Sequence, residues 1–344
     1  VHSVSLYTHP RDHVCHRSFA RAAPEPRSAL SLRDGAPALR AVAGSQKGKT
    51  VAVPTMSPAC GKWPSLFILG AAKCGTTSLS AALTEAGATL ASTTCCKTHL
   101  PASASHICRN PGWPKETQFL EHCMANGGCE SYPRLYETNP GGQAMDATPL
   151  LLNKPPGTNM THARWLALFM PSQWWPHARF IISIREPVAR LFSWYNFAKH
   201  GGWEHAKTFW AYMKEKGTKH MAYVNAVTQW RSVWRRDAIL ILNYHRTFEG
   251  DQPAALAALA SFTGLQRLSH ASSFGKHNAY PSVKNASPSP KMDCGVRDYL
   301  LRSFSESTKQ LLDMIAHDHI AGTAPPEEPA FGAFPTPGCV HWVP

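Results

Sequence analysis

Residues 66–83 read LFILGAAKCGTTSLSAAL, and this stretch decides the fold. An apolar run closes on Gly70, a turn follows, and the remaining residues repeat apolar side chains at helical spacing. The pattern predicts a strand, a loop and a helix. The first N–H groups of such a helix have no partner within it, and its dipole places partial positive charge there, so we expect an anion at this loop. The candidate ligand-binding residues are Lys73, Cys74, Gly75, Thr76, Thr77 and Ser78.

Lys73 adds a full charge to this loop, Gly75 lets the main chain approach a ligand closely, and the hydroxyl groups are further donors. A βα turn with a surface lysine is the alternative interpretation. The residue order differs from that of an ATP or GTP P-loop, in which lysine directly follows the second glycine. Here Lys73 precedes Gly75, and Lys-Cys-Gly-Thr-Thr after a strand resembles the 5′-phosphosulfate loop of sulfotransferases that use 3′-phosphoadenosine 5′-phosphosulfate (PAPS).

A second stretch, residues 179–195, reads RFIISIREPVARLFSWY. It resembles the second signature of the same family, a strand followed by Arg-acid-Pro-Val-x-Arg-x-x-Ser-x-Tyr. The resemblance implies that Arg185 and Ser193 bind the 3′-phosphate of PAPS. Two independent motifs in the expected order make the resemblance specific.

Residues 115–120, KETQFL, are similar to a third family element, whose glutamate acts as general base on the acceptor in glycan sulfotransferases. The resemblance implies that Glu116 is the catalytic base and Lys73 the catalytic cation. Leu120 replaces the second aromatic residue of the family element. A solvated pair of Glu116 with Lys115 is the alternative interpretation, since exposed Glu-Lys pairs are common.

Two further segments match the family in part. Residues 143–150, QAMDATPL, look like a family strand end, but Ala147 stands where many heparan-type enzymes carry lysine. Residues 276–281, KHNAYP, resemble the loop that closes over the 3′-phosphate and keep its lysine and proline, which implies a cofactor contact by Lys276. The resemblance covers residues 66–315 and implies a P-loop NTPase-like α/β fold, a parallel sheet with helices on both faces and no required metal.

Apolar periodicity predicts further elements outside the motifs. We expect helices at residues 161–170, 204–236, 254–263 and 297–315. The continuous apolar run at 237–244 predicts a strand buried on both faces, beside the phosphate-loop strand. Residues 95–129 are expected to form a loop-rich insertion. Residues 43–50 match the loose P-loop pattern, but Val51-Ala52-Val53-Pro54 follows and opposes a helix, so we expect no nucleotide site there.

The chain has 344 residues, enough for one large α/β domain with appendages. Its 35 basic and 22 acidic residues give a net charge of +13, which favours anionic partners. We find no nucleic-acid-binding signature, and no run of about 18 apolar residues that would span a membrane. We expect a stem, linker or transit-like segment at 1–62, poorly ordered, the sulfotransferase domain at 63–320 and a Pro-rich tail at 321–344. A membrane anchor would have to precede residue 1.

Ten cysteines are many for a cytosolic enzyme, and five fall close together, at Cys95, Cys96, Cys108, Cys123 and Cys129. This favours a lumenal or secreted compartment with disulfides over a zinc site, because the spacing of zinc knuckles is missing. Cys339 is a candidate partner for another cysteine. Asn159 and Asn285 begin glycosylation sequences. We expect the Golgi lumen or secretory pathway, with cytoplasm or plastid as the alternative.

The predicted reaction is transfer of a sulfuryl group from PAPS to an acceptor hydroxyl or amine, with a glycan as the favoured acceptor. A small-molecule metabolite is the alternative acceptor. A P-loop kinase or NTPase is a rival of another class, in which Asp146 would bind Mg²⁺. A glycan-binding module without catalysis explains the tryptophans and basic residues but not the two nucleotide-type motifs. The sequence does not indicate the oligomeric state.

Overall fold

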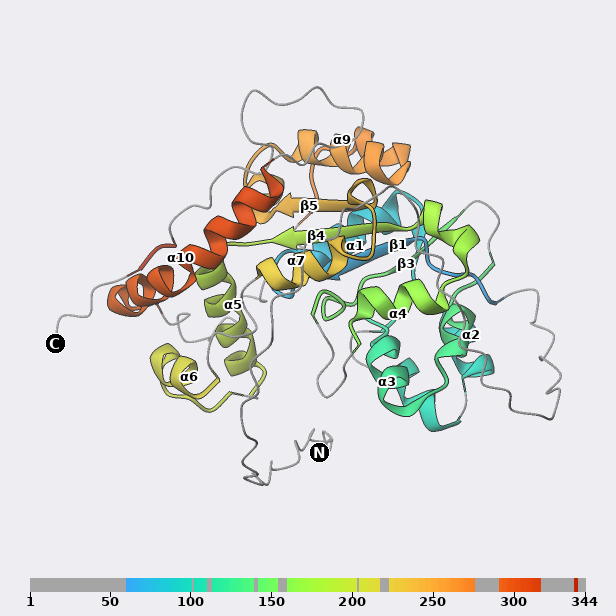
Figure 1. Ribbon diagram of the computed structural model, residues 1–344, viewed down its shortest axis with the longest axis horizontal. Helices are drawn as coiled ribbons and strands as arrows, with labels where there is room; N and C mark the ends of the chain where they lie inside the picture. Colours follow the sequence, from blue (N-terminus) through green and yellow to red (C-terminus); the bar gives the residue numbers. More distant parts are fainter. Residues whose placement is uncertain are drawn as a thin grey trace, which may run out of the picture. The chain divides into compact units, whose positions relative to one another are not determined.

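The computed structural model describes residues 60–100, 102–109, 113–138, 142–153, 160–202, 204–216, 223–275, 291–316 and 337–339. These residues form a five-stranded parallel sheet in the order β2-β3-β1-β4-β5, with helices packed against it (Figure 1). The strands are β1 (Leu66–Gly70), β2 (Ala88–Thr89), β3 (Gln143–Asp146), β4 (Arg179–Ile184) and β5 (Ile239–Asn243). The predicted α/β fold is confirmed.

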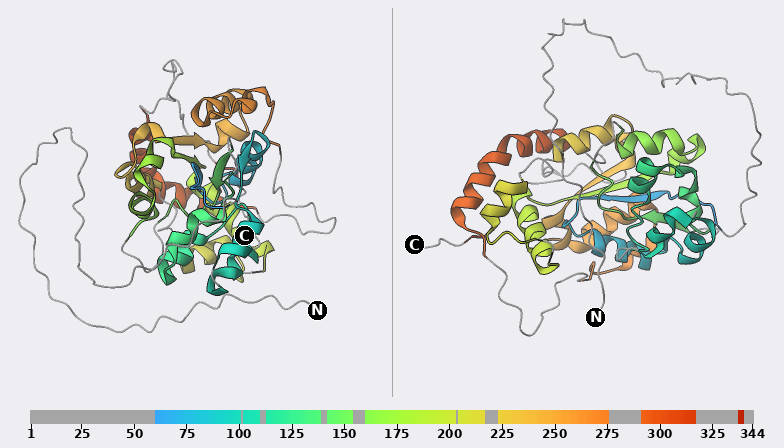
Figure 2. Two further views of the ribbon diagram at one scale, coloured as in Figure 1. Left: turned by 90° about the vertical axis from the view of Figure 1, so that its right-hand side faces the viewer. Right: turned by 90° about the horizontal axis from the view of Figure 1, so that it is seen from below.

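The apolar side chains of β1 alternate between two cores, one on each face of the sheet. Leu66 and Ile68 pack with α1 (Thr76–Glu85) and α9 (Gln252–Thr263). Phe67 and Leu69 belong to the core of the opposite face, which is formed by α4 (His162–Phe169), α7 (Tyr223–Arg231) and the end of α10 (Cys294–Ile315). Figure 2 shows these helix layers from two further directions. Burial on both faces explains why β1, β4 and β5 are apolar almost throughout.

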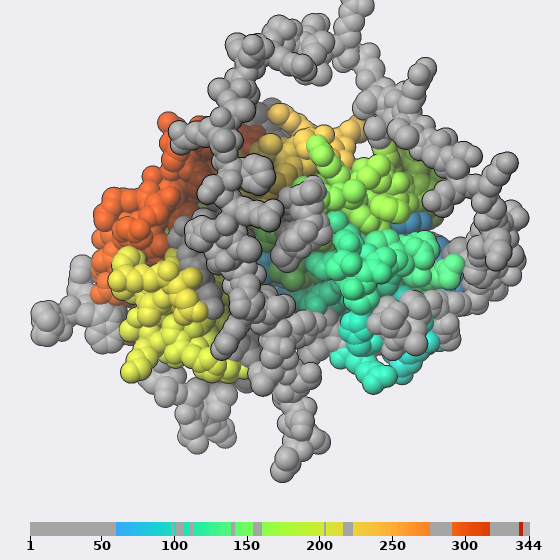
Figure 3. Space-filling view, turned by 60° about the horizontal axis from the view of Figure 1, so that its bottom comes forward, coloured from blue at the N-terminus to red at the C-terminus, as the bar shows by residue number. Residues whose placement is uncertain are grey.

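A third core lies beyond the carboxyl end of β4. It joins α5 (Pro187–His200), α6 (Phe209–Lys216) and the first half of α10, with Leu191, Phe209 and Leu300 among its buried members. In the space-filling view α6 and α10 lie on one side of the molecule, and α3 (Phe119–Asn126) and α4 on the other (Figure 3). The helices on the two sides of the phosphate loop therefore pack into separate hydrophobic cores.

The sheet order corrects one prediction and refines another. β5 pairs with β4, with Phe180 opposite Ile239 and Ile184 opposite Asn243, and not with the phosphate-loop strand β1. The reason is that β4 occupies that side of β1. The helical region predicted at 204–236 contains the separate helices α6 and α7. The helices predicted at 161–170, 254–263 and 297–315 are confirmed as α4, α9 and α10.

Residues 95–129 differ from the predicted loop-rich insertion. They carry short helices instead: α2 (Thr93–His99), η1 (Ala102–Arg109), α3 and the start of η2 (Cys129–Leu135). Three disulfides brace this region, Cys60–Cys95, Cys96–Cys108 and Cys123–Cys129. A fourth, Cys294–Cys339, confirms that Cys339 pairs with another cysteine. Cross-links of this kind stabilise short segments that bury little apolar area of their own.

The remaining described helices are η3 (Ser172–His177), η4 (Arg236–Ala238), α8 (Tyr244–Phe248) and η5 (Gln266–His270). None of the helices in the described part of the chain has both the length and the apolar character needed to cross a membrane. The segment 43–50, both glycosylation asparagines and Lys276 lie outside the described residues.

Candidate active site

The phosphate loop lies where the chain changes direction across the sheet. From β1 the chain continues to β2 and β3 on one side, then crosses to β4 and β5 on the other. In parallel sheets of this kind, ligands bind at the carboxyl ends of the strands, at this switch point. Residues 71–75 follow the carboxyl end of β1. The carboxyl ends of β3 and β4 lie on either side of them.

Neighbouring elements hold the main chain of this loop at several points. Ser183 Oγ, on β4, donates a 2.7 Å hydrogen bond to Cys74 O. Arg190 Nε, on α5, donates a 3.1 Å hydrogen bond to Ala72 O. The main-chain N–H of Ala71 donates to Ser183 O at 2.8 Å. The loop conformation is therefore fixed by β4 and α5 as well as by its own sequence.

Gly75 is the N-cap residue of α1, and both its backbone conformation and the nearby Phe248 ring favour glycine. Its φ is 78°, in the left-handed region, and a Cβ there would lie 2.3 Å from Phe248 Cε2. No side chain caps α1, and its first turn contains no acidic residue. Thr76 and Ser78 are buried, whereas Thr77 is half-buried. The helix start is thus suited to an anion, as predicted from its uncapped N–H groups and dipole.

Cys74 points inward, although the sequence placed it among the candidate ligand contacts. Its thiol is fully buried, 3.6 Å from Tyr223 OH on α7, and burial raises the pKa of the thiol. The Cys74 N–H donates to Ala71 O at 3.1 Å. The thiol, the N–H and the carbonyl of Cys74 therefore all contact protein groups, and the residue holds the loop in its conformation.

Lys73 occupies the opposite, more open side of the loop. Its φ is 68°, and its ammonium lies 4.0 Å from the centre of the Phe197 ring on α5. Burial lowers the pKa of Lys73, the Arg185 charge lowers it further, and the Glu116 carboxylate opposes the shift. Lys73 follows β1, Arg185 follows β4 and the Glu116 segment is bonded to the end of β3, so the three residues lie at the same edge of the sheet.

Arg185 is the first residue after β4. Its guanidinium stacks on the Tyr244 ring at the end of β5, 4.6 Å from the ring centre, and among the described residues its buried Nε has no hydrogen-bond partner. The next residue, Glu186, caps α5 by accepting from the N–H groups of Val188 and Ala189. Ser193 lies half-buried in the second turn of α5. A cation with an unfilled donor next to the phosphate loop is suited to a second phosphate group.

The segment with Glu116 is fastened to the end of β3. Lys115 O accepts a 3.1 Å hydrogen bond from Ala147 N, and Thr117 Oγ1 donates to Asp146 Oδ2 at 3.0 Å. Glu116 itself is 29% exposed and forms a 2.6 Å ion pair with Lys115. The carboxylate is therefore held at the same edge of the sheet as the phosphate loop, in contact with a lysine.

Asp146 is the centre of this attachment, which sequence reasoning missed. It is fully buried, and its oxygens accept from Thr117 Oγ1, Tyr132 OH, Thr148 N and Thr148 Oγ1 at 2.6–3.0 Å. The sequence signal that could have indicated this role is Asp-Ala-Thr-Pro at residues 146–149, at a predicted strand end. These bonds occupy the carboxylate that the rival kinase interpretation assigned to Mg²⁺.

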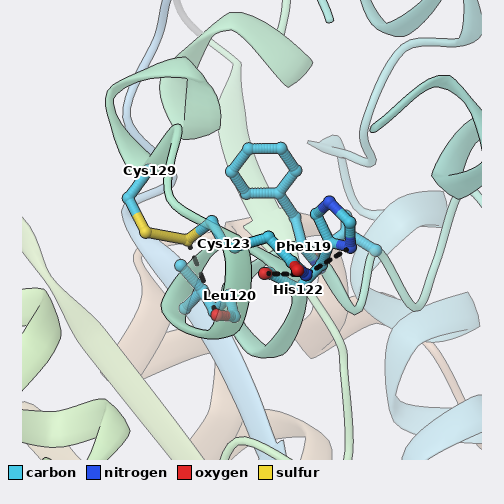
Figure 4. The surroundings of a disulfide bond; sticks show 7 residues. Phe119, Leu120, His122, Cys123 and Cys129 are labelled. Carbon is cyan, nitrogen blue, oxygen red and sulfur yellow. Dashed lines mark hydrogen bonds between the residues drawn. A yellow bond between two sulfur atoms is a disulfide. The ribbon is translucent and has the colours of Figure 1, made fainter. Parts of the chain in front are cut away.

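A second buried carboxylate, Glu121, lies in the first turn of α3. Figure 4 shows this helix with the Cys123–Cys129 disulfide at its end. Glu121 Oε1 is 3.8 Å from His162 Nε2 on α4, and neither atom has a hydrogen-bond partner among the described residues. Burial raises the pKa of Glu121 to about 7, and it lowers the pKa of His162. Glu121 was not singled out from the sequence, and for His162 packing was the default expectation.

Comparisons with known proteins place the chain in one family. The family model of the sulfotransferase domain matches residues 64–323. Among solved structures, the crystal structure of a sulfotransferase from Alicyclobacillus acidocaldarius is similar, with a TM-score of 0.48 and 22% sequence identity over 75% of this chain and 97% of the other. The comparison with curated proteins found no match.

Proposed function

The chain belongs to the sulfotransferase family and is a sulfotransferase, and we propose that it transfers the sulfuryl group of PAPS to a hydroxyl or amine of a glycan. The observation that carries this proposal is that Lys73 after β1, Arg185 after β4 and Glu116 on the segment bonded to β3 share the carboxyl edge of the sheet. It supplies two cations for an anionic donor and one carboxylate for an acceptor. Transfer of this kind asks the protein mainly for alignment and for positive charge where negative charge develops.

The residues around the loop fit PAPS, whose bound form would supply an activated sulfuryl group and two phosphate positions. The uncapped start of α1 suits the 5′ end, and Gly75 supplies the left-handed turn that leads into it. Lys73, with the hydroxyl groups of Thr76, Thr77 and Ser78, would bind there, and Cys74 would keep the loop in shape. Arg185 and Ser193 would bind the 3′-phosphate, joined by Lys276.

Glu116 is the proposed general base, which accepts the proton of the acceptor group. The fixed position of its segment on β3 supports this role, because a base must be held within hydrogen-bond reach of the proton it removes. Its ion pair with Lys115 also fits the alternative of a partly solvated Glu-Lys pair. Lys115 must therefore release the carboxylate, or share it, when an acceptor binds.

The substitution Glu116→Gln separates these two interpretations, because it keeps the shape and removes the basicity. We expect normal PAPS binding and a turnover rate lower by ~10²–10⁴ at saturating acceptor. The matched control is Glu130→Gln, an exposed glutamate on η2. If Glu116→Gln turns over within a few fold of the wild type, Glu116 is not the base, and the alternative of a solvated ion pair with Lys115 holds.

A glycan in the secretory pathway is the proposed acceptor class. Two features support it: a net charge of +13, which favours anionic polymers, and the four disulfides in the described part of the chain, which are stable in an oxidising lumen. The proposed boundaries are a stem at 1–62, the catalytic domain at 63–320 and a tail at 321–344. A small-molecule alcohol, phenol or amine is the second candidate. A panel of glycans and small alcohols, assayed side by side with labelled PAPS, tests the choice, and transfer to small alcohols alone would contradict it.

A further inference from the structure

Exposed apolar side chains are concentrated at one end of the sheet. Five large hydrophobic residues are substantially exposed among the described residues: Leu150, Leu168, Phe169, Trp175 and Tyr299. Three of them fall between positions 168 and 175, with exposed fractions of 58%, 49% and 40%. Single exposed apolar residues are normal on protein surfaces, but a group of them marks an interaction site.

The three side chains lie at the junction of α4 and η3, and we call them the α4–η3 patch (Leu168, Phe169 and Trp175). Trp175 Nε1 donates a 3.0 Å hydrogen bond to Met170 O, which fastens η3 to the end of α4. Phe169 stacks on Trp165 with ring centres 4.5 Å apart. These contacts fix Phe169 and Trp175 in position, although both side chains stay exposed.

Exposed arginines lie beside this patch. Arg164 is exposed one helical turn before Leu168, so the two share a face of α4. Arg235 and Arg236 are exposed just before β5, and the contact of the Trp175 and Trp234 rings, with centres 5.8 Å apart, places that segment beside η3. Asp237 pairs with Arg235 and offsets its charge. Arg164 and Arg236 remain as exposed cations next to tryptophan, phenylalanine and leucine.

We propose that the α4–η3 patch docks on the surface of an anionic lipid bilayer. Leucine, phenylalanine and tryptophan insert into the boundary between headgroups and acyl chains, and arginine binds anionic headgroups. The apolar residues at this junction match the acyl boundary, and the neighbouring arginines match the headgroups. The proposal is independent of the acceptor and of the reaction.

Charge argues against other occupants of the patch. The segment 1–59 of the chain is itself rich in arginine, and a second copy would bring the same cationic surface, so both would be repelled. A soluble polyanion would satisfy the arginines but would leave Leu168 and Phe169 in water. An anionic bilayer satisfies the charges and covers the apolar groups together.

The position of the patch gives docking a consequence for the enzyme. η3 leads into the amino end of β4 at Arg179, whereas Arg185 follows its carboxyl end. The patch and the candidate active site are therefore at opposite ends of the strands, separated by roughly 20 Å of strand. A molecule docked through the patch presents its active site away from the bilayer.

The test is co-sedimentation of the full chain with phosphatidylcholine vesicles, with and without phosphatidylserine. We expect the wild type to bind only when phosphatidylserine is present. Leu168→Ser with Phe169→Ser should lower the bound fraction by about tenfold or more. Arg164→Glu should lower it by at least about fivefold, the effect of one arginine near the surface.

Two matched controls are needed, because a chain of net charge +13 is attracted to anionic vesicles wherever its charges lie. Tyr299→Ser removes a side chain that is also 49% exposed, and Arg302→Glu reverses another exposed arginine, both on α10. Both controls should bind nearly as the wild type does. Equal losses in patch and control variants, or no binding of the wild type, would overturn the proposal. Conversion of a wild-type dimer into a monomer by the patch variants, seen by gel filtration, would also overturn it and assign the patch to a second copy.

Discussion

Arg190 Nε lies 3.1 Å from Ala72 O and donates a hydrogen bond to it, which ties α5 to the phosphate loop. Arg190 is 5% exposed, and its guanidinium lies 4.9 Å from the centre of the Tyr223 ring. The Tyr223 hydroxyl in turn donates to Arg185 O at 2.9 Å. One buried arginine thus connects the two proposed phosphate-binding residues, Lys73 and Arg185, through the main chain.

Arg190→Met should weaken PAPS binding without removing a group that touches PAPS. Methionine keeps the apolar stem and loses the donor, and a hydrogen bond from a charged group contributes about 1.5–3 kcal/mol, so we expect the KM for PAPS to rise by roughly 10–100-fold. The KM for the acceptor should change little, and Arg190→Lys should restore part of the loss. A Michaelis constant for PAPS that stays at the wild-type value in a destabilised Arg190→Met protein would assign the arginine to folding alone.

Gly75→Ala should be far more damaging than the same change at a glycine with open space. Both Gly75 and Gly264 have φ near 77°, but an added Cβ meets Phe248 only at Gly75. Gly264→Ala reports the cost of the left-handed conformation, about 1–2 kcal/mol, in its free energy of unfolding. Gly75→Ala should lower the free energy of unfolding by more than that and should abolish PAPS binding. Adding Phe248→Ala to the same chain should recover part of the stability. Equal effects at the two positions would show that the loop has room to adjust.

Asp146→Asn should lower stability because the carboxylate accepts from four donors in a fully buried place. An amide replaces one acceptor oxygen by a donor, which faces the hydroxyl groups already present. We expect a loss on the order of 3 kcal/mol, seen as a fall in Tm of roughly 6–12 °C. Asp251→Asn is the control, since Asp251 caps α9 and asparagine caps equally well. A Tm within a degree or two of the control would mean that the network is not required.

The pKa of Glu121, raised to about 7 by burial, makes stability depend on pH. In the unfolded chain its ordinary value is 4.5, so between these values the folded state binds more protons, and stability falls as pH rises from 4.5 to about 7. Glu121→Gln removes this penalty. It should leave the free energy of unfolding unchanged at or below pH 4.5 and raise it by up to about 3 kcal/mol above pH 7.

Urea unfolding of wild type and Glu121→Gln across this pH range measures the difference. Glu85→Gln, at an exposed position on α1, should show no such trend. His162 has a lowered pKa and acts in the opposite direction, destabilising the folded state as pH falls below 6.5, but this contribution is common to both proteins. A difference that is flat across the range would mean that Glu121 is ionised without cost.

The sequence predicted the central strand, loop and helix well because local rules and tertiary needs agree there. Residues 66–69 are apolar for a strand buried on both faces, and Gly75 stands where a left-handed residue begins α1. The predicted strand at 237–244 exists as β5, but its neighbour was wrong. Strand order depends on where each connection between strands brings the chain back to the sheet. An apolar run in the sequence does not indicate which strand will be its neighbour.

The insertion and the buried polar groups were harder to predict. The helices between Cys95 and Cys129 are short and held by disulfides, so they lack the long apolar stripe that reveals a helix. Asp146, Arg190 and Tyr223 each bond to at least one partner that is 14 or more residues away in sequence. Such contacts exist only once the chain has folded, which is why the sequence motifs pointed to Lys73 and Arg185 as candidates but not to the residues that hold them.

The most direct test of the account is the transfer of labelled sulfate from PAPS by the wild type and by Lys73→Ala, with Lys309→Ala as an exposed-lysine control. Lys73 is the side-chain cation of the phosphate loop, and loss of one preorganised donor of this kind typically costs ~10²–10³ in rate. We predict transfer by the wild type and the control, and a loss of that size in a folded Lys73→Ala protein. Near-normal transfer by folded Lys73→Ala would contradict the assignment of this loop as the sulfuryl-donor site.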